Sequence, residues 1–252
     1  MSDLLLILVA AVWGAASGAL LPRAAYRFSA PDEEPWRETC PQGHPIGGRI
    51  RGWVGGTRCE ACAGGAEGAG APYGPRALPL STVTAFLCAA LAAATGTRPE
   101  LAVWLVLAPV GVLLAAVDLR VRRLPNPLTL SLAAAALALL GLAALAPEHA
   151  GDWTTALLGS LALGVGYLVL HLINPGGMGF GDVKLALGAG AALGWYGWPT
   201  VMLGTFAGFL LGALYGGVLV VLRRANRKTA IPFGPFLIVG AFLGLLIGAF
   251  TA

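Results

Sequence analysis

The sequence predicts an all-α polytopic membrane protein with about eight transmembrane helices and a Gly- and Pro-rich first loop on the cytoplasmic side. Of its 252 residues, 57% are hydrophobic and only 11% are charged, whereas a soluble globular chain carries about 25% charged residues. Apolar runs of membrane-spanning length recur along the chain. One soluble core could not bury so many runs, because each is about as long as a bilayer is thick.

Eight apolar runs are predicted to cross the membrane as helices, because lipid offers no hydrogen-bond partners to an open backbone. The first run follows Asp3 and has no basic residue before it. We therefore predict a retained helix rather than a cleaved signal peptide. The sixth run is short and rich in glycine. The predicted spans are residues 4–21, 79–95, 101–117, 128–146, 153–173, 182–198, 200–222 and 232–250.

The basic residues determine the predicted orientation. Of the 16 Lys and Arg residues, all except Arg98 fall in alternate loops or at their ends, and cytoplasmic loops carry such an excess. Both termini are therefore predicted to lie outside. The net charge of +4 reflects this orientation, so no nucleic-acid partner is expected. The bases on the predicted cytoplasmic side are Arg23, Arg27, Arg37, Arg49, Arg51, Arg58, Arg76, Arg120, Arg122, Arg123, Lys184, Arg223, Arg224, Arg227 and Lys228.

Three parts are predicted along the chain: a first transmembrane helix at 1–21, a cytoplasmic loop at 22–78 and a seven-helix membrane core at 79–252. The loop carries three of the four cysteines. The remaining one, Cys88, falls in an apolar span and is predicted to be a small buried hydrophobe.

Two aspartates stand apart from the other acidic residues. Asp118 closes the third predicted span and Asp182 opens the sixth, so both are expected at the same depth on the cytoplasmic side. An ionisable group near the hydrocarbon is unfavourable and indicates function. Two carboxyl groups at one depth could share a proton and activate water for hydrolysis. Acidic residues assigned to loops on the other side are Glu100, Glu148 and Asp152.

Simpler interpretations of each aspartate also exist. Asp182 could be the N-cap of its helix, since Asp is a favoured cap. Asp118 could pair with a nearby arginine, one of Arg120, Arg122 and Arg123. The glycines before Asp182 favour the functional interpretation, because residues without Cβ allow close approach of a substrate backbone. These glycines are Gly176, Gly177, Gly179 and Gly181.

Three segments carry a family resemblance. The segment Gly179-Phe-Gly-Asp-Val-Lys184 resembles the GxGDxK motif of type IV prepilin leader peptidases, which are GxGD intramembrane aspartyl proteases. The segment 118–126, which ends in Leu-Pro-Asn, is similar to the one carrying their first catalytic aspartate. Ile231-Pro-Phe-Gly-Pro-Phe236 resembles a third family segment. Together these motifs are specific, and the resemblance covers about residues 101–250.

The resemblance implies a multi-pass inner-membrane (plasma-membrane) protease, surrounded by lipid, whose substrate is a prepilin or pseudopilin. Its catalytic residues would be Asp118 and Asp182, supported by Gly179, Gly181 and Lys184. For Lys184 the alternative is a snorkelling base at the membrane interface.

Long-form members of this family have two Cys-x-x-Cys pairs in the first loop, which the resemblance links to zinc, and they methylate the new N-terminus with S-adenosylmethionine. Here one pair is intact, Cys59-Glu-Ala-Cys62, and the other reads Cys40-Pro-Gln-Gly with His44 next to it. Three thiols and one imidazole could form a Cys₃His zinc site. The alternative is unpaired structural cysteines. Departures elsewhere in the loop, such as Pro22 in place of a family Asn, put methyl transfer in question.

Two rival functions follow from the same residues. An ion-coupled membrane transporter could use the aspartates as ion sites, since transporters also contain helices broken at glycine, although their sites usually lie near the bilayer midplane. A preflagellin-type peptidase without methyltransferase activity would use the same aspartates on another substrate.

Overall fold

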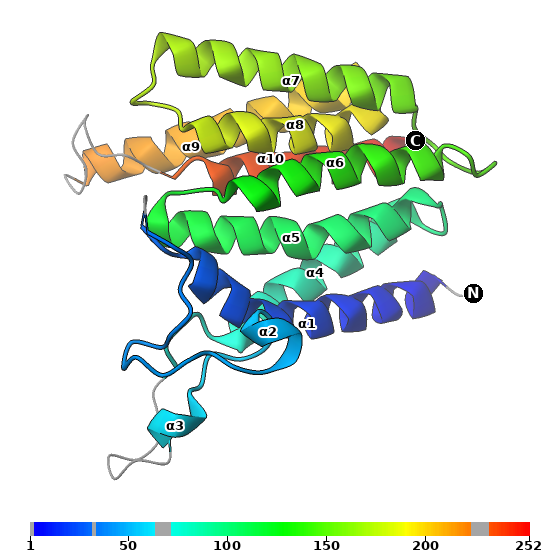
Figure 1. Ribbon diagram of the computed structural model, residues 1–252. Helices are drawn as coiled ribbons and strands as arrows, with labels where there is room; N and C mark the ends of the chain where they lie inside the picture. The colour runs from blue at the N-terminus through cyan, green and yellow to red at the C-terminus, as the bar shows by residue number, and fades with distance from the viewer. Residues whose placement is uncertain (1–2, 32–33, 64–71, 223–231) are drawn as a thin grey trace.

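The computed structural model describes residues 3–31, 34–63, 72–222 and 232–252, and within them every regular element is a helix (Figure 1). One isolated bridge joins Thr39 to Pro45. The helices are α1 (Asp3–Phe28), α2 (Arg49–Gly52), α3 (Glu60–Ala63), α4 (Ala77–Thr95), α5 (Glu100–Val121), α6 (Asn126–Ala143), α7 (Trp153–Ile173), α8 (Phe180–Trp195), α9 (Trp198–Val221) and α10 (Gly234–Thr251).

Seven of the described helices are long and apolar enough to cross a membrane: α1, α4, α5, α6, α7, α9 and α10. The remaining predicted span, the sixth at residues 182–198, corresponds to α8, which has only 16 residues. The prediction of a polytopic all-helical membrane protein is therefore confirmed.

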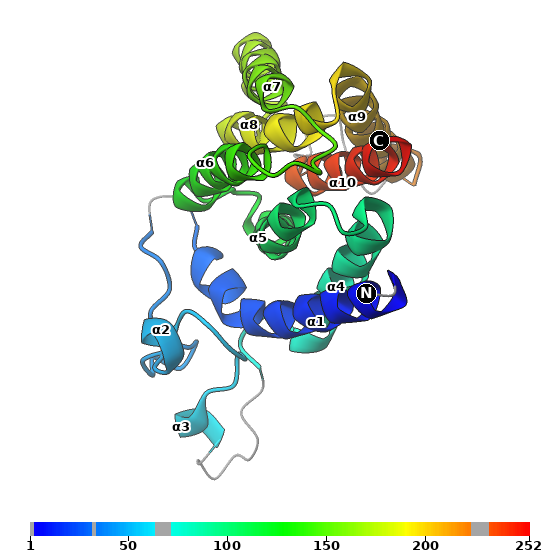
Figure 2. The ribbon, with the colours of Figure 1, turned by 90° about the vertical axis from the view of Figure 1, so that its right-hand side faces the viewer.

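The short helix α8 lies inside the bundle, against α6, α7, α9 and α10 (Figure 2). It tolerates this crowding because most of its buried residues are glycine or alanine. A Cβ placed on Gly190 would lie 2.3 Å from the carbonyl oxygen of Gly159 on α7, so these two backbones touch. Small residues allow such close helix packing in lipid, where van der Waals contact drives association. The glycines make the sixth predicted span less hydrophobic, but they also let neighbouring helices approach α8 closely enough to bury it.

The first loop and the chain termini lie at opposite ends of the bundle. Figure 1 shows α2 and α3 at one end, with both termini at the other. The ends of α5 and α7 and the start of α8 lie at the loop end. This agrees with the predicted alternation of spans. The seventh-loop bases Arg223, Arg224, Arg227 and Lys228, and also Ile231, lie outside the described residues.

The boundary predicted at residue 21 is wrong, because α1 continues to Phe28 with Pro22 inside it. The added turns are covered by the first loop, so their polar side chains are not left in lipid. Arg27 is only 6% exposed and lies over the ring of Trp53, 4.0 Å from its centroid. Arg23 donates to the carbonyl oxygens of Gly47 and Gly56. Residues 22–28 are therefore the helical platform on which the loop packs.

The other boundaries differ by a few residues. The helix α5 runs past Asp118 to Val121 and ends where Arg122 adopts a left-handed conformation, with φ 53°. The helix α8 starts two residues before Asp182. Glu100 was assigned to a loop, but it is the first residue of α5 and is fully buried.

Candidate active site and metal centre

Asp118 lies in the last turn of α5 and is only 4% exposed. Its carboxylate Oδ2 accepts a hydrogen bond from the backbone N–H of Gly234, 3.1 Å away, at the start of α10. The first N–H groups of a helix have no partner within the helix and favour a negative charge. Asp118 is thus held by a helix that begins more than a hundred residues later. The nearby Arg123 donates to the carbonyl oxygen of Pro31 in the first loop, 2.9 Å away.

Asp182 lies in the first turn of α8 and is 7% exposed. Its Oδ2 accepts the backbone N–H of Gly179 at 3.2 Å, and its own N–H donates to the carbonyl of Gly179 at 3.0 Å. The interpretation of Asp182 as the N-cap is therefore wrong: Gly179 is the N-cap, and Asp182, the third helical residue, accepts the Gly179 N–H. This hydrogen bond engages only the Oδ2 atom of Asp182, so the carboxyl group could also take part in catalysis.

The two aspartates meet at one place through Leu124, in the turn between α5 and α6. A Cβ on Gly181, the neighbour of Asp182, would lie 2.9 Å from the Cβ of Leu124. A Cβ on Gly234, the hydrogen-bond donor to Asp118, would lie 3.4 Å from the Leu124 Cδ1. The structure therefore brings both predicted residues into one buried site.

Space for a side chain is lacking at Gly234 and tight at Gly179, one on each side of this site. At Gly234 a Cβ would lie 2.7 Å from the Asp118 Oδ2 atom, and at Gly179 it would lie 3.3 Å from the Asp182 Oδ2 atom. Sequence reasoning quoted the segment that contains Gly234 but gave this residue no role. The sequence signal that could have identified Gly234 is the segment Pro-Phe-Gly-Pro. Neither a predicted turn nor a helical periodicity accounts for a glycine at this position.

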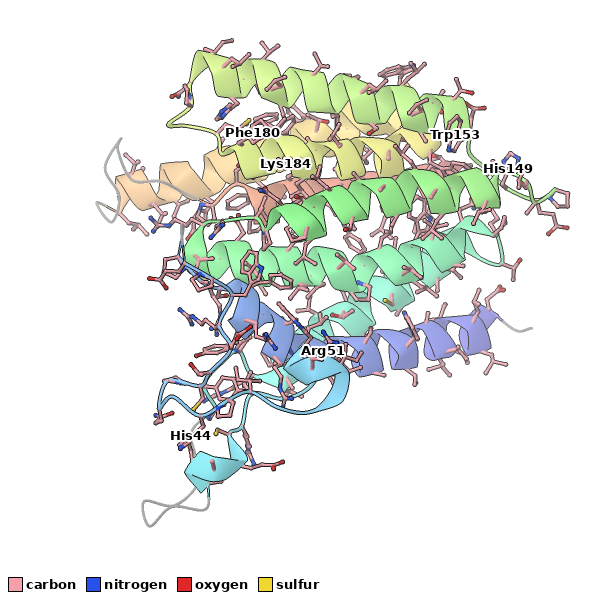
Figure 3. All side chains as sticks on the ribbon, in the orientation of Figure 1. His44, Arg51, His149, Trp153, Phe180 and Lys184 are labelled. Atoms are coloured by element: carbon pink, nitrogen blue, oxygen red, sulfur yellow. The ribbon has the colours of Figure 1, made fainter. Side chains whose placement is uncertain are left out.

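Lys184 faces away from Asp182 and connects the segment 179–184 to the segment 118–126. Its Nζ donates to the Oδ1 of Asn126 on α6, 2.6 Å away, and lies 4.5 Å from the ring centroid of Phe180. Figure 3 shows Phe180 and Lys184 at the loop end of α8, far from His149 and Trp153 at the other end. Lys184 therefore ties the start of α8 to the Leu-Pro-Asn turn that carries Leu124.

The four predicted metal ligands come together in the first loop. Cys40 and His44 flank a tight turn, in which the Cys40 N–H donates to the His44 carbonyl, while Cys59 precedes α3 and Cys62 lies in it. Their ligand atoms all lie within 4.8 Å of one another. Figure 3 places His44 at the end of the molecule where α3 lies. This cluster could bind a metal ion.

The distances suit a small tetrahedral site. The Sγ atoms of Cys40 and Cys62 are 3.8 Å apart, and the Nδ1 of His44 is 3.2 Å from the Cys62 Sγ. A tetrahedral zinc ion with Zn–S bonds of about 2.3 Å would hold two sulfurs about 3.8 Å apart.

Electrostatics within this cluster favour a cation. Burial opposes ionisation of the Cys40 thiol, but hydrogen bonds at Gln42 and His44 outweigh it and lower the pKa of Cys40 to about 6. Burial, with the neighbouring thiols of Cys59 and Cys40, raises the pKa of Cys62 to about 12. Thiolates crowd one another in this way when no positive charge lies between them, and a divalent ion would relieve the repulsion.

Comparison with known proteins finds similarity in the region that contains the two aspartates. Residues 105–217 match the type IV leader peptidase family. A protein of Aeromonas hydrophila named prepilin leader peptidase/N-methyltransferase is 35% identical over 206 residues, covering 78% of this chain and 64% of that protein. A protein of the same name from Aeromonas salmonicida (strain A449) is 38% identical over 145 residues, covering 54% of this chain and 46% of that protein.

A third protein of this name, from Pectobacterium carotovorum subsp. carotovorum, is 32% identical over 184 residues, which is 68% of this chain and 59% of that protein. The chain thus spans about half to two thirds of the length of these relatives. No solved structure matches it significantly. The segment that matches the type IV leader peptidase family contains Asp118, Asp182 and the turn between α5 and α6.

Proposed function

We propose that this chain is a membrane-embedded aspartyl endopeptidase, which removes the leader peptide from prepilins or pseudopilins at the cytoplasmic face of the inner membrane. The observation that carries the proposal is the buried site in which Asp118 and Asp182, from two helices far apart in sequence, are held by the N–H groups of Gly234 and Gly179. The family and the relatives' printed names support the substrate class.

In this proposal the two carboxyl groups share one proton, because neighbouring like charges do not both ionise. The ionised group accepts a proton from a water molecule as the water oxygen attacks the carbonyl carbon of the scissile bond. The protonated group gives its proton to the leaving nitrogen as the C–N bond breaks. Each helix N-terminus stabilises the carboxylate beside it.

The position of the site suits a precursor whose leader stays in the cytoplasm while its hydrophobic helix lies in the bilayer. Both aspartates lie at the end of the bundle that carries the first loop, the end predicted to be cytoplasmic from the basic residues. This position argues against the rival transporter, whose ion sites would be expected near the middle of the spans. A preflagellin-type substrate would use the same site, and cleavage assays on both precursors separate the two.

The test is to replace each aspartate by asparagine and to follow cleavage of a co-expressed prepilin by mass spectrometry of its N-terminus. Asp118→Asn and Asp182→Asn should each lower cleavage by about 10³-fold or more, because a catalytic unit fails when one member is removed. Asp152→Asn is the matched control. Asp152 caps α7 at the other end by accepting the N–H of Thr155, and asparagine caps equally well. Wild-type cleavage by both site variants would refute the proposal.

We further propose that Cys40, His44, Cys59 and Cys62 hold a structural zinc ion. An ion there would fix the turn at Cys40 to α3 and supply no step of the hydrolysis. The relatives' names also include N-methyltransferase. Methyl transfer from S-adenosylmethionine is the second candidate activity, and the same mass measurement reports it as the added mass of one methyl group on the new N-terminus.

A further inference from the structure

Tyr167 carries a buried hydroxyl group that the fold does not use. It lies on α7 and is only 2% exposed. Its ring packs against those of Phe209 and Phe233, with centroids 5.6 Å and 6.1 Å away. Within the described residues its hydroxyl has no hydrogen-bond partner. A buried, unpaired hydroxyl is unfavourable for folding, so its presence calls for an explanation outside stability.

The contacts of Tyr167 place it at the aspartate site. Phe233, against which its ring packs, directly precedes Gly234, the donor to Asp118. The same buried cluster contains Leu124, which links the two aspartates, and Val183, which follows Asp182. Tyr167 therefore lies beside the site on α7, a third helix besides α5 and α8.

Other buried polar atoms without a partner in the described part of the chain lie elsewhere. Those of Thr95, Arg98, Glu100 and Trp195 belong to the opposite end of the bundle, that of Arg27 lies under the first loop, and that of Thr205 lies on α9. Among these residues, only Tyr167 has an unpaired hydrogen-bond donor and also lies close to Asp182.

The geometry points to Tyr167 as a third catalytic residue, whose hydroxyl donates a hydrogen bond to the carbonyl oxygen of the scissile peptide bond. This inference rests on the proposed peptidase function. When the water oxygen bonds to the carbonyl carbon, the electron pair of the C=O bond moves onto its oxygen, and the Tyr167 O–H stabilises that charge. Tyr167 keeps its proton throughout, since the two aspartates carry out the proton transfers. Donors aimed at a developing oxyanion are strongly catalytic.

Tyr167→Phe tests the idea cleanly, because it removes one oxygen and keeps the ring that packs on Phe209 and Phe233. The hydroxyl has no partner to lose in the free enzyme, so the unfolding temperature in detergent should not fall. The kcat for cleavage of a purified prepilin should fall about 10²-fold, with KM nearly unchanged, as for an interaction made in the transition state. Tyr215→Phe on α9, whose ring packs on Phe236, is the matched control and should leave kcat unchanged.

Three outcomes would overturn the inference: wild-type kcat in Tyr167→Phe, a lower kcat that comes with a lower unfolding temperature, or a displaced pH profile. The last would mean that the hydroxyl acts on the aspartates and not on the substrate. Failure of the inference is distinguishable from failure of the proposed function. In the first case the wild type and Tyr167→Phe cleave alike while the aspartate variants do not. In the second case either the wild type itself does not cleave or both aspartate variants cleave as well as the wild type.

Discussion

The two ends of the helix bundle both bury carboxyl groups, but they hold them in different ways. At the end opposite the loop, Glu100 faces the guanidinium of Arg98 at 3.9 Å. Its Oε1 also accepts from the hydroxyl of Tyr196 and the N–H of Ala150, at 3.5 Å and 3.4 Å. At the loop end, the hydrogen bonds that the Asp118 and Asp182 carboxylates accept within the described chain come from neutral backbone N–H groups.

The difference shows what each end is suited to do. A carboxylate beside a cation keeps its charge and ties helices together, and here Arg98 also donates to the carbonyl of Ala249 on α10, 2.7 Å away. Two carboxyl groups in one buried site, whose donors within the described residues are neutral, are suited to exchange a proton with water or substrate. The Glu100 end is therefore suited to be a structural clamp, and we call the aspartate end, where hydrolysis is proposed, the reactive end.

Among the changes that compare the two ends without altering an aspartate, the largest effect is expected from Gly234→Ala, which should disturb only the reactive end. The new Cβ would lie 2.7 Å from the Asp118 Oδ2 atom, so the carboxylate must move. A displacement of this kind should lower kcat for prepilin cleavage by about 10²-fold. The unfolding temperature should change little, since alanine is a good helix residue at the start of α10.

The matched control is Gly166→Ala on α7, where nothing lies within 4 Å of the added Cβ. It should cleave at the wild-type rate. Equal rates for Gly234→Ala and Gly166→Ala would mean that the position of the Asp118 carboxylate does not matter for the reaction.

A smaller effect, of a different kind, is expected from Glu100→Gln. The substitution keeps the shape of the side chain but leaves the partly buried Arg98 without its counter-charge, which should destabilise the folded protein by about 1–3 kcal/mol. Thermal unfolding in detergent measures this loss. The kcat per folded molecule should be unchanged. A loss of kcat at normal stability would contradict the division between the two ends.

Much of this arrangement could be predicted from the sequence. Apolar runs predicted eight spans because lipid imposes a length on each helix, and seven of them are helices of spanning length within the described residues. The spacing of Arg and Lys put Asp118 and Asp182 at one end. The four candidate metal ligands could be named because cysteine and histidine spacings are local signals. These predictions depended on residues near one another in the sequence, or on the common constraint of the bilayer.

What could not be predicted depends on contacts between distant segments. The burial of Glu100 requires Arg98, Tyr196 and Ala150, which meet only in the folded bundle. The continuation of α1 past Pro22 requires the first loop to cover Arg27. The need for glycine at 234 arises from Asp118, more than a hundred residues away. Hydropathy and periodicity carry none of this information.

The smallest effect is expected from removing the metal, which tests how far the reactive end depends on the loop beside it. The loop reaches the site through an aromatic contact, in which Phe28 and Trp36 pack at 5.0 Å and belong to the cluster that contains Val117, the residue before Asp118. The metal ligands lie farther out in the same loop. Loss of the ion should therefore loosen the loop and affect the aspartates only through this packing.

His44→Ala and Cys62→Ser should both lower the zinc content of the purified protein, because a tetrahedral site needs all four ligands. Cys88→Ser, which alters a cysteine in α4 outside the cluster, should leave the zinc content unchanged. We expect kcat for prepilin cleavage to fall by no more than about tenfold in the ligand variants, since outer contacts around a site typically contribute at about that level. Elemental analysis and proteolysis of the loop measure the first effect, and the cleavage assay measures the second. A loss of kcat as large as that of Gly234→Ala would show that the loop is part of the reactive end rather than a support for it.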